Sequence, residues 1–104
     1  MNKRYAIPTV LIKRGPMRFF SQIDLTRVIE RAIRRSELPV YYTQGFTPRI
    51  KMSFYGALKV GAEGRIPLKL YFIERIDTGE ICARLQPQLP AGLTILPDSG
   101  DTRG

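Results

Sequence analysis

The sequence predicts a ferredoxin-like α+β fold, with the element order strand, helix, strand, strand, helix, strand. Three observations support this. Apolar residues alternate along two long runs, two further segments carry apolar residues at helical spacing, and 104 residues suffice for one domain but not for two. Two such units with right-handed crossovers give a four-stranded antiparallel sheet with both helices on one face. The other face stays open, as in many RNA-binding domains, although the signature aromatic residues of the common RNA-recognition domain are absent.

The first strand is expected from Arg4 to Lys13, because this run is rich in β-favouring residues and ends at the turn dipeptide Gly15-Pro16. Pro8 lies inside the run and cannot donate a ladder hydrogen bond, so it either places the run at a sheet edge or splits it. Met17 to Phe20 is expected to be a short extended continuation.

A basic helix is expected to begin at Ser21, which can cap free backbone N–H groups, with Asp24 in the first turn where the helix dipole favours negative charge. Five apolar residues recur at core-facing spacing: Leu25, Val28, Ile29, Ala32 and Ile33. Four arginines occupy the opposite face: Arg27, Arg31, Arg34 and Arg35. The helix should end before Pro39. The arginines are either a solvated face with Glu30–Arg34 pairing or a stripe that contacts phosphates.

The stretch from Gln44 to Phe54 is central to the functional argument. It follows a short extended aromatic segment, Val40 to Thr43, and opens with a loop in which Gly45 is free to adopt a positive φ. From position 49 the residues alternate as in a strand. One side carries Arg49, Lys51 and Ser53, and the side expected to join the core carries Ile50, Met52 and Phe54.

Aromatic residues lie close to these cations in the sequence: Tyr41, Tyr42, Phe46 and Tyr55. Basic residues interleaved with rings can neutralise phosphates and stack on unpaired bases. Packing in the core is the alternative, which we expect for Phe54 and one of the two adjacent tyrosines, whereas both interpretations stay open for Phe46. The glycine-rich segment 56–64 contains Lys59 and could bring backbone N–H groups to an anion, although a plain connection between strands fits it better. We expect the candidate RNA-binding residues to share one patch: Arg27, Arg31, Arg34, Arg35, Gln44, Phe46, Arg49, Lys51, Tyr55 and Lys59.

The remaining residues complete the sheet. Arg65 to Glu74 is expected to be a strand, with Ile66, Leu68, Leu70 and Phe72 on one side and Lys69, Tyr71 and Ile73 on the other. A second helix should follow a cap at Asp77 or Thr78, bury Ile81, Leu85 and Leu89, and close at Pro87 and Pro90. A last strand is expected from Leu93 to Leu96. Residues 1–97 then form a single domain, with a disordered tail at 98–104.

Composition points to an anionic partner rather than to a reaction. The chain has 17 Lys+Arg against 9 Asp+Glu, a formal charge of +8, and nucleic acid is the commonest partner of such a surplus. It has no histidine and one cysteine, Cys82, so this chain alone cannot supply a His-based triad, an iron–sulfur cluster or a structural zinc site. We expect no cofactor, no metal and no catalytic residue. Without a long apolar run or a signal peptide, we expect a cytoplasmic protein with no membrane partner.

Five motifs carry a resemblance to a known family. They run in order along the chain: residues 15–25 (GPMRFFSQIDL), 31–39 (RAIRRSELP), 44–48 (QGFTP), 51–54 (KMSF) and 57–61 (ALKVG). They resemble the N-terminal half of the radical-SAM-linked family, bacterial proteins of unassigned function associated with radical S-adenosylmethionine enzymes. The resemblance implies a partner enzyme that carries the iron–sulfur cluster, and a link to RNA or ribosome metabolism through ribonuclease-type neighbours.

The chain departs from this family pattern at several positions. The family has histidine at Gln22, asparagine or histidine at Thr47, histidine and proline at Arg49 and Ile50, and proline at Lys59. An acidic strand in the family is replaced here by a basic and apolar one. These departures add positive charge, which favours polyanion binding over catalysis. Family members are about twice as long, so we expect this chain to complete itself as a homodimer or by docking on another subunit.

Three functions stay open, in this order. The first is an RNA-binding accessory module that presents RNA to a separate radical SAM or ribonuclease-type enzyme. The second is a metal-free endoribonuclease resembling the CRISPR repeat-processing enzymes, in which Lys51, Lys59 or Tyr55 would stabilise the scissile phosphate. The third is a protein-interaction subunit whose basic face meets an acidic partner.

Overall fold

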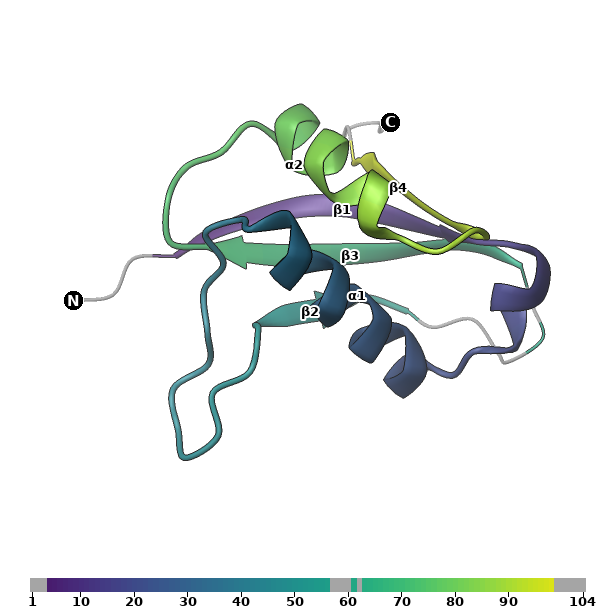
Figure 1. Cartoon of the computed structure of the whole chain (residues 1–104), viewed down its shortest axis with the longest axis horizontal. Helices are drawn as coiled ribbons and strands as arrows, with labels where there is room; N and C mark the ends of the chain where they lie inside the picture. The colour runs from purple at the N-terminus through teal and green to yellow at the C-terminus, as the bar shows by residue number, and fades with distance from the viewer. Residues whose placement is uncertain (1–3, 57–60, 62, 99–104) are drawn as a thin grey trace.

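The computed structural model describes residues 4–56, 61 and 63–98, and it has the ferredoxin-like architecture that the sequence predicts (Figure 1). In chain order the elements are β1 (Tyr5–Lys13), the 3-10 helix η1 (Gly15–Phe19), α1 (Gln22–Ser36), β2 (Met52–Phe54), β3 (Gly64–Phe72), α2 (Thr78–Leu85), the 3-10 helix η2 (Gln86–Gln88) and β4 (Leu93–Pro97). The strands lie in the order β2-β3-β1-β4, and each neighbouring pair is antiparallel. Figure 1 shows both α-helices on the same side of this sheet.

The two faces of the sheet follow from the alternation of side chains along its strands. On β3, Leu70 is buried in the core that the helices cover, so Lys69 and Tyr71 on either side of it point to the opposite face. The strand register extends this division to β2, because Leu70 pairs with Met52 whereas Lys69 pairs with Ser53. Among the described residues, no helix covers the face of Lys69 and Tyr71.

The hydrophobic core lies between the other face of the sheet and the helices. The helices contribute Leu25, Ile29, Ala32, Ile33, Ile81, Cys82 and Leu85, all buried. Burial of each large aliphatic side chain stabilises the fold by roughly 1.5–3 kcal/mol. The predicted core stripe of the first helix is therefore confirmed, with Val28 half-buried at its border.

Residues 15–19 form a 3-10 helix, so the prediction of an extended continuation after the first strand is wrong. Gly15 has a φ of 60°, which residues with a side chain rarely adopt, and Pro16 then supplies a fixed helical φ. The N–H of Phe20 donates to the carbonyl of Met17 at 3.0 Å and closes the turn. Met17 is buried as a result, in the part of the core that Gly92 closely approaches.

The first helix is capped as the sequence predicts. The Ser21 hydroxyl accepts a hydrogen bond from the Asp24 N–H at 3.2 Å, and the Asp24 carboxylate accepts one from the Ser21 N–H at 3.1 Å. The backbone hydrogen bond from Ser21 is the main reason why the pKa of Asp24 is lowered. α1 ends at Ser36, before Pro39, because Glu37 adopts a left-handed conformation with a φ of 59°.

The second half of the chain follows the predicted order. Asp77 is the N-cap of α2, and its carboxylate accepts hydrogen bonds from two N–H groups of the first turn. Cys82 packs in the core, and this burial raises the pKa of its thiol. Of the predicted tail at 98–104, only Asp98 lies within the described residues, and Lys59 lies outside them. No helix in the described ranges combines the length and the apolarity that crossing a membrane requires.

Candidate nucleic-acid interface

The sheet face that no described helix covers carries three tyrosines next to three cations. Together with Ser53 we name this group the tyrosine patch: Arg4, Tyr41, Lys51, Ser53, Tyr55, Lys69 and Tyr71. β2 and its flanking residues supply Lys51, Ser53 and Tyr55, and β3 supplies Lys69 and Tyr71. The strand pairing thus brings together residues that lie far apart in the sequence.

Tyr71 is at the centre of the tyrosine patch. Its hydroxyl is 3.2 Å from the hydroxyl of Ser53 on the neighbouring strand. Two cations approach its ring, with the guanidinium carbon of Arg4 5.8 Å and Nζ of Lys51 5.1 Å from the ring centroid. The pKa of the Tyr71 phenol is lowered, mainly by the hydrogen bond to Ser53 and further by Tyr55 and two nearby lysines. The patch therefore favours negative charge at this position.

Tyr41 extends the tyrosine patch beyond the end of β2. Its ring centroid lies 5.6 Å from the guanidinium carbon of Arg4, and the residue is buried. The Tyr41 N–H donates to the Tyr71 carbonyl and the Tyr41 carbonyl accepts from the Lys51 N–H, both at 2.9 Å. These bonds hold the segment against the sheet, and they fix the backbone of Lys51.

Tyr55 and Lys69 form the other end of the tyrosine patch. The Lys69 Nζ is 5.2 Å from the centroid of the Tyr55 ring, and Tyr55 is 47% exposed. Both residues help to line a pocket of about 320 Å³, together with Pro8, Pro67 and Asp98. Proline surfaces beside an aromatic ring and an ammonium group can accept a flat, hydrogen-bonding ligand such as a nucleobase.

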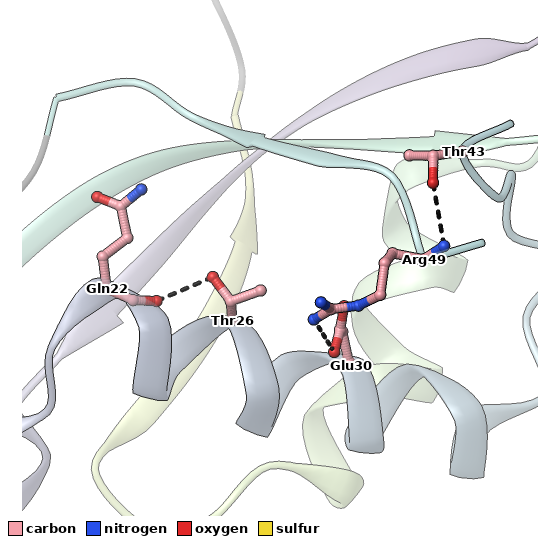
Figure 2. A network of polar contacts seen from close by, with 5 residues as sticks. All are labelled: Gln22, Thr26, Glu30, Thr43 and Arg49. Atoms are coloured by element: carbon pink, nitrogen blue, oxygen red, sulfur yellow. Dashed lines mark hydrogen bonds and ion pairs between the residues drawn. The ribbon is translucent and has the colours of Figure 1, made fainter. Parts of the chain in front are cut away.

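Alternation predicts Arg49 on the same sheet face as Lys51, and this prediction is wrong. The Arg49 side chain instead reaches Glu30 on α1 (Figure 2). Its Nε and Nη2 donate to the carboxylate of Glu30, with a shortest distance of 2.8 Å, and its backbone N–H donates to the Thr43 hydroxyl at 3.0 Å. The hydrogen bonds to Glu30 raise the pKa of Arg49. Glu30 is buried and pairs with Arg49 rather than with Arg34, so the Glu30–Arg34 pairing that the solvated-face alternative included does not form. Arg49 lies before β2 begins at Met52, so the alternation of the strand does not decide where its side chain points.

The arginines of α1 lie on the helix layer of the molecule. Their side chains are exposed, whereas the opposite side of the helix packs against the sheet: Arg27, Arg31, Arg34 and Arg35. Arg35 donates to the side-chain oxygen of Gln88 at 3.1 Å and to its backbone carbonyl at 2.8 Å. The expectation of one shared patch is therefore wrong for these four arginines. They lie on the outer side of α1, whereas the tyrosine patch lies on the opposite face of the sheet.

The loop between α1 and β2 carries the remaining described candidates, Gln44 and Phe46. It projects beyond the edge of the sheet in Figure 1. Phe46 is fully exposed, and the Gln44 side chain donates to the Tyr42 carbonyl at 3.2 Å. A fully exposed ring is not packed in the core, so the core-packing interpretation of Phe46 is wrong, and the ring is accessible to a partner. The strand predicted from position 49 is shorter than expected, because β2 begins only at Met52. Before it, Ile50 forms an isolated bridge with Tyr42.

Comparison with protein families assigns most of the chain to a family. A family described as "Uncharacterized protein conserved in bacteria (DUF2344)" matches residues 8–98. The chain belongs to this family. No curated protein and no solved structure matches the chain. The region shared with DUF2344 includes every residue of the tyrosine patch except Arg4.

The candidates predicted from the sequence include Lys51 and Tyr55 of the tyrosine patch but not its other five residues. Tyr41 and Ser53 were at least placed beside the basic strand, whereas three residues of this DUF2344 chain were not connected with it: Arg4, Lys69 and Tyr71. A signal for two of them was present, because alternation along residues 65–74 placed Lys69 and Tyr71 on the side away from the core. Their proximity to Lys51 depends on the register between β2 and β3, a long-range contact that alternation within one strand does not reveal. Arg4 carries no local signal, since its position over Tyr71 depends on the pairing of β1 with β3.

Proposed function

We propose that the protein is an RNA-binding accessory module that holds single-stranded RNA across the open face of its sheet. The tyrosine patch carries this proposal. The exposed ring of Tyr55 and the half-buried ring of Tyr71 can stack on unpaired bases, while the cations of the patch can neutralise the adjacent phosphates. Ring stacking contributes about 1–3 kcal/mol per base. The pocket beside Tyr55 supplies a place for one base that is turned out of the strand.

Phe46 supports the same proposal from the loop. Its ring is fully exposed, and the backbone near it is held by the Arg49–Glu30 ion pair and by the hydrogen bond from the Arg49 N–H to Thr43. A ring on a loop that is anchored at its base can stack on a base with a smaller loss of conformational entropy than a ring on a free loop. The loop would therefore extend the RNA site beyond the edge of the sheet.

The enzyme that receives the RNA would be a radical SAM or ribonuclease-type enzyme. The support for this partner class is the resemblance of the five sequence motifs to the radical-SAM-linked family. The module would then supply RNA affinity, and the separate enzyme would supply the chemistry.

Binding of labelled single-stranded RNA, followed by fluorescence anisotropy, tests the proposal. Tyr55→Ala should weaken binding by roughly 5- to 150-fold, the equivalent of one lost stacking contact. Lys51→Gln combined with Lys69→Gln should also weaken it, while the charge-matched pair Arg27→Gln and Arg34→Gln on the helix layer should leave it nearly unchanged. Equal losses from both pairs would contradict binding on the sheet face.

A metal-free endoribonuclease is the second candidate, and the surroundings of Tyr71 favour it. Because its pKa is lowered, Tyr71 could lose its phenol proton and, as a phenolate beside Ser53, accept the proton of an attacking 2′-hydroxyl. The 2′-oxygen would bond to phosphorus as the bond from phosphorus to the 5′-oxygen breaks, while the ammonium groups of Lys51 and Lys69 stabilise the phosphate and one of them protonates the leaving 5′-oxygen. Incubation with labelled structured RNA and a chelator should give cleavage that Tyr71→Phe abolishes. Intact RNA after incubation with the native protein would eliminate this candidate and leave the binding proposal standing.

A further inference from the structure

A groove of about 390 Å³ lies between α1 and η2, on the helix layer and separate from the tyrosine patch. Its floor is apolar and contains Met17, Phe20, Val28, Leu89 and Pro90. Met17 is buried, while Phe20, Val28 and Leu89 are half-buried against the core. The core therefore leaves a concave apolar surface here, of a volume that ligand pockets commonly have.

Two arginines of α1, Arg31 and Arg35, line this groove one helical turn apart. Arg35 is held by Gln88, whose side-chain and backbone oxygens accept at 3.1 Å and 2.8 Å. These acceptors are neutral, so they orient the guanidinium without compensating its charge. Within the described part of the chain, neither arginine forms an ion pair, and no carboxylate lines the groove.

We propose that this groove docks an acidic segment of a partner protein, in which an apolar side chain enters the floor and flanking carboxylates pair with Arg31 and Arg35. Side chains one turn apart on a helix are separated by about 6 Å at Cβ, a spacing that two carboxylates of a short segment can span. Guanidinium–carboxylate hydrogen bonds are among the stronger polar contacts, and a formal charge of +8 favours an acidic partner.

The floor favours a protein segment over RNA as the occupant. Met17, Val28, Leu89 and Pro90 are aliphatic, and the one ring among the lining residues, Phe20, is half-buried. Unpaired bases bind on exposed aromatic faces, whereas a concave aliphatic floor fits the side chains that anchor peptides in grooves. The docking proposal stands on its own residues and does not depend on RNA binding by the sheet face.

Titration of the isotope-labelled full chain with short synthetic peptides, followed by amide chemical shifts, tests the docking proposal. The probe is a peptide with leucine flanked by glutamates, compared with a version flanked by lysines and a version with serine in place of leucine. We expect saturable shifts at groove residues with the first peptide, and weaker binding of both others. Arg31→Glu should weaken binding by roughly tenfold or more, whereas Arg34→Glu, a charge reversal on the same helix outside the groove lining, should have little effect.

Three results would overturn the docking proposal. The first is the absence of saturable shifts in the groove with the glutamate-flanked peptide. The second is equal binding of the serine version, or equal losses from Arg31→Glu and Arg34→Glu, either of which would reduce the interaction to unspecific charge attraction. The third is a shift of the groove residues by single-stranded RNA in place of the peptide, which would assign the groove to RNA.

Discussion

The salt dependence of RNA binding distinguishes a strand that contacts the sheet face alone from one that contacts both basic faces, because binding by both faces neutralises more phosphates. The tyrosine patch offers Arg4, Lys51 and Lys69, and Arg65 is exposed further along the same face of β3. For single strands the slope of log K against log salt is about −0.7 per phosphate contact, which gives a slope between about −2 and −3 for this face. If the α1 arginines also contacted the strand, the slope would be about −5 or steeper.

These slopes are far enough apart to measure. Between 50 and 200 mM salt, the affinity should fall by about 20- to 50-fold if only the sheet face binds, and by about 900-fold or more if both faces bind. Anisotropy titrations of labelled single-stranded RNA at several salt concentrations give the slope directly. Lys69→Gln should make it shallower by about 0.7, while Arg34→Gln should not change it. A slope near −5, or one that responds to Arg34→Gln, would refute the assignment of binding to the sheet face.

Further predictions concern the stability of the fold. Gly92→Ala places a methyl carbon 2.7 Å from a backbone oxygen at a φ of 98°, and should cost roughly 3 kcal/mol in urea unfolding. Gly15→Ala, at a φ of 60° with open space around it, should cost only about 1 kcal/mol. Because folding lowers the pKa of Asp24 from its ordinary value of 3.8, the capping box stabilises the fold above that pH and loses its effect below it, so Asp24→Asn should remove part of the acid-induced loss of stability. Glu30→Gln and Arg49→Gln should each lower the melting temperature, because each removes one partner of the ion pair. In a double-mutant cycle, the loss of stability in the double variant should be clearly smaller than the sum of the two single losses.

Local chemistry made several features predictable from the sequence. Ser21 and Asp24 form the capping box because both partners lie within one helical turn, so their spacing alone decides the contact. The buried side of β3 was predictable for the same reason, since alternation fixes which residues face the core once one of them does. Asp77 likewise caps α2 through N–H groups two and three residues away.

Features that depend on long-range contacts were not predictable in this way. Arg49 shares its alternation with Lys51, but it lies before β2 begins and its guanidinium meets Glu30 on α1, a residue 19 positions away. The direction of the Arg49 side chain is therefore set by the loop before β2, and not by the alternation that holds within the strand. The tyrosine patch shows the same limit, because Arg4 reaches the ring of Tyr71 only through the pairing of β1 with β3.

The two proposed surfaces lie on opposite layers of a molecule whose shortest extent is 24 Å, so RNA and an acidic segment would not compete for space. Both ligands are anionic, and each would lower the positive potential that attracts the other. The electrostatic repulsion between the two bound ligands is screened beyond about 8 Å at physiological ionic strength. It should therefore weaken simultaneous binding in dilute buffer and fade as salt is added. If RNA and the acidic segment still strongly weakened each other's binding at physiological salt, the sheet itself would have to change its structure. β3 connects the two surfaces, because its outer residues belong to the tyrosine patch and its inner residues pack against the helices. Simultaneous binding at that salt concentration is therefore what the present architecture favours, with RNA on one layer and a partner protein on the other.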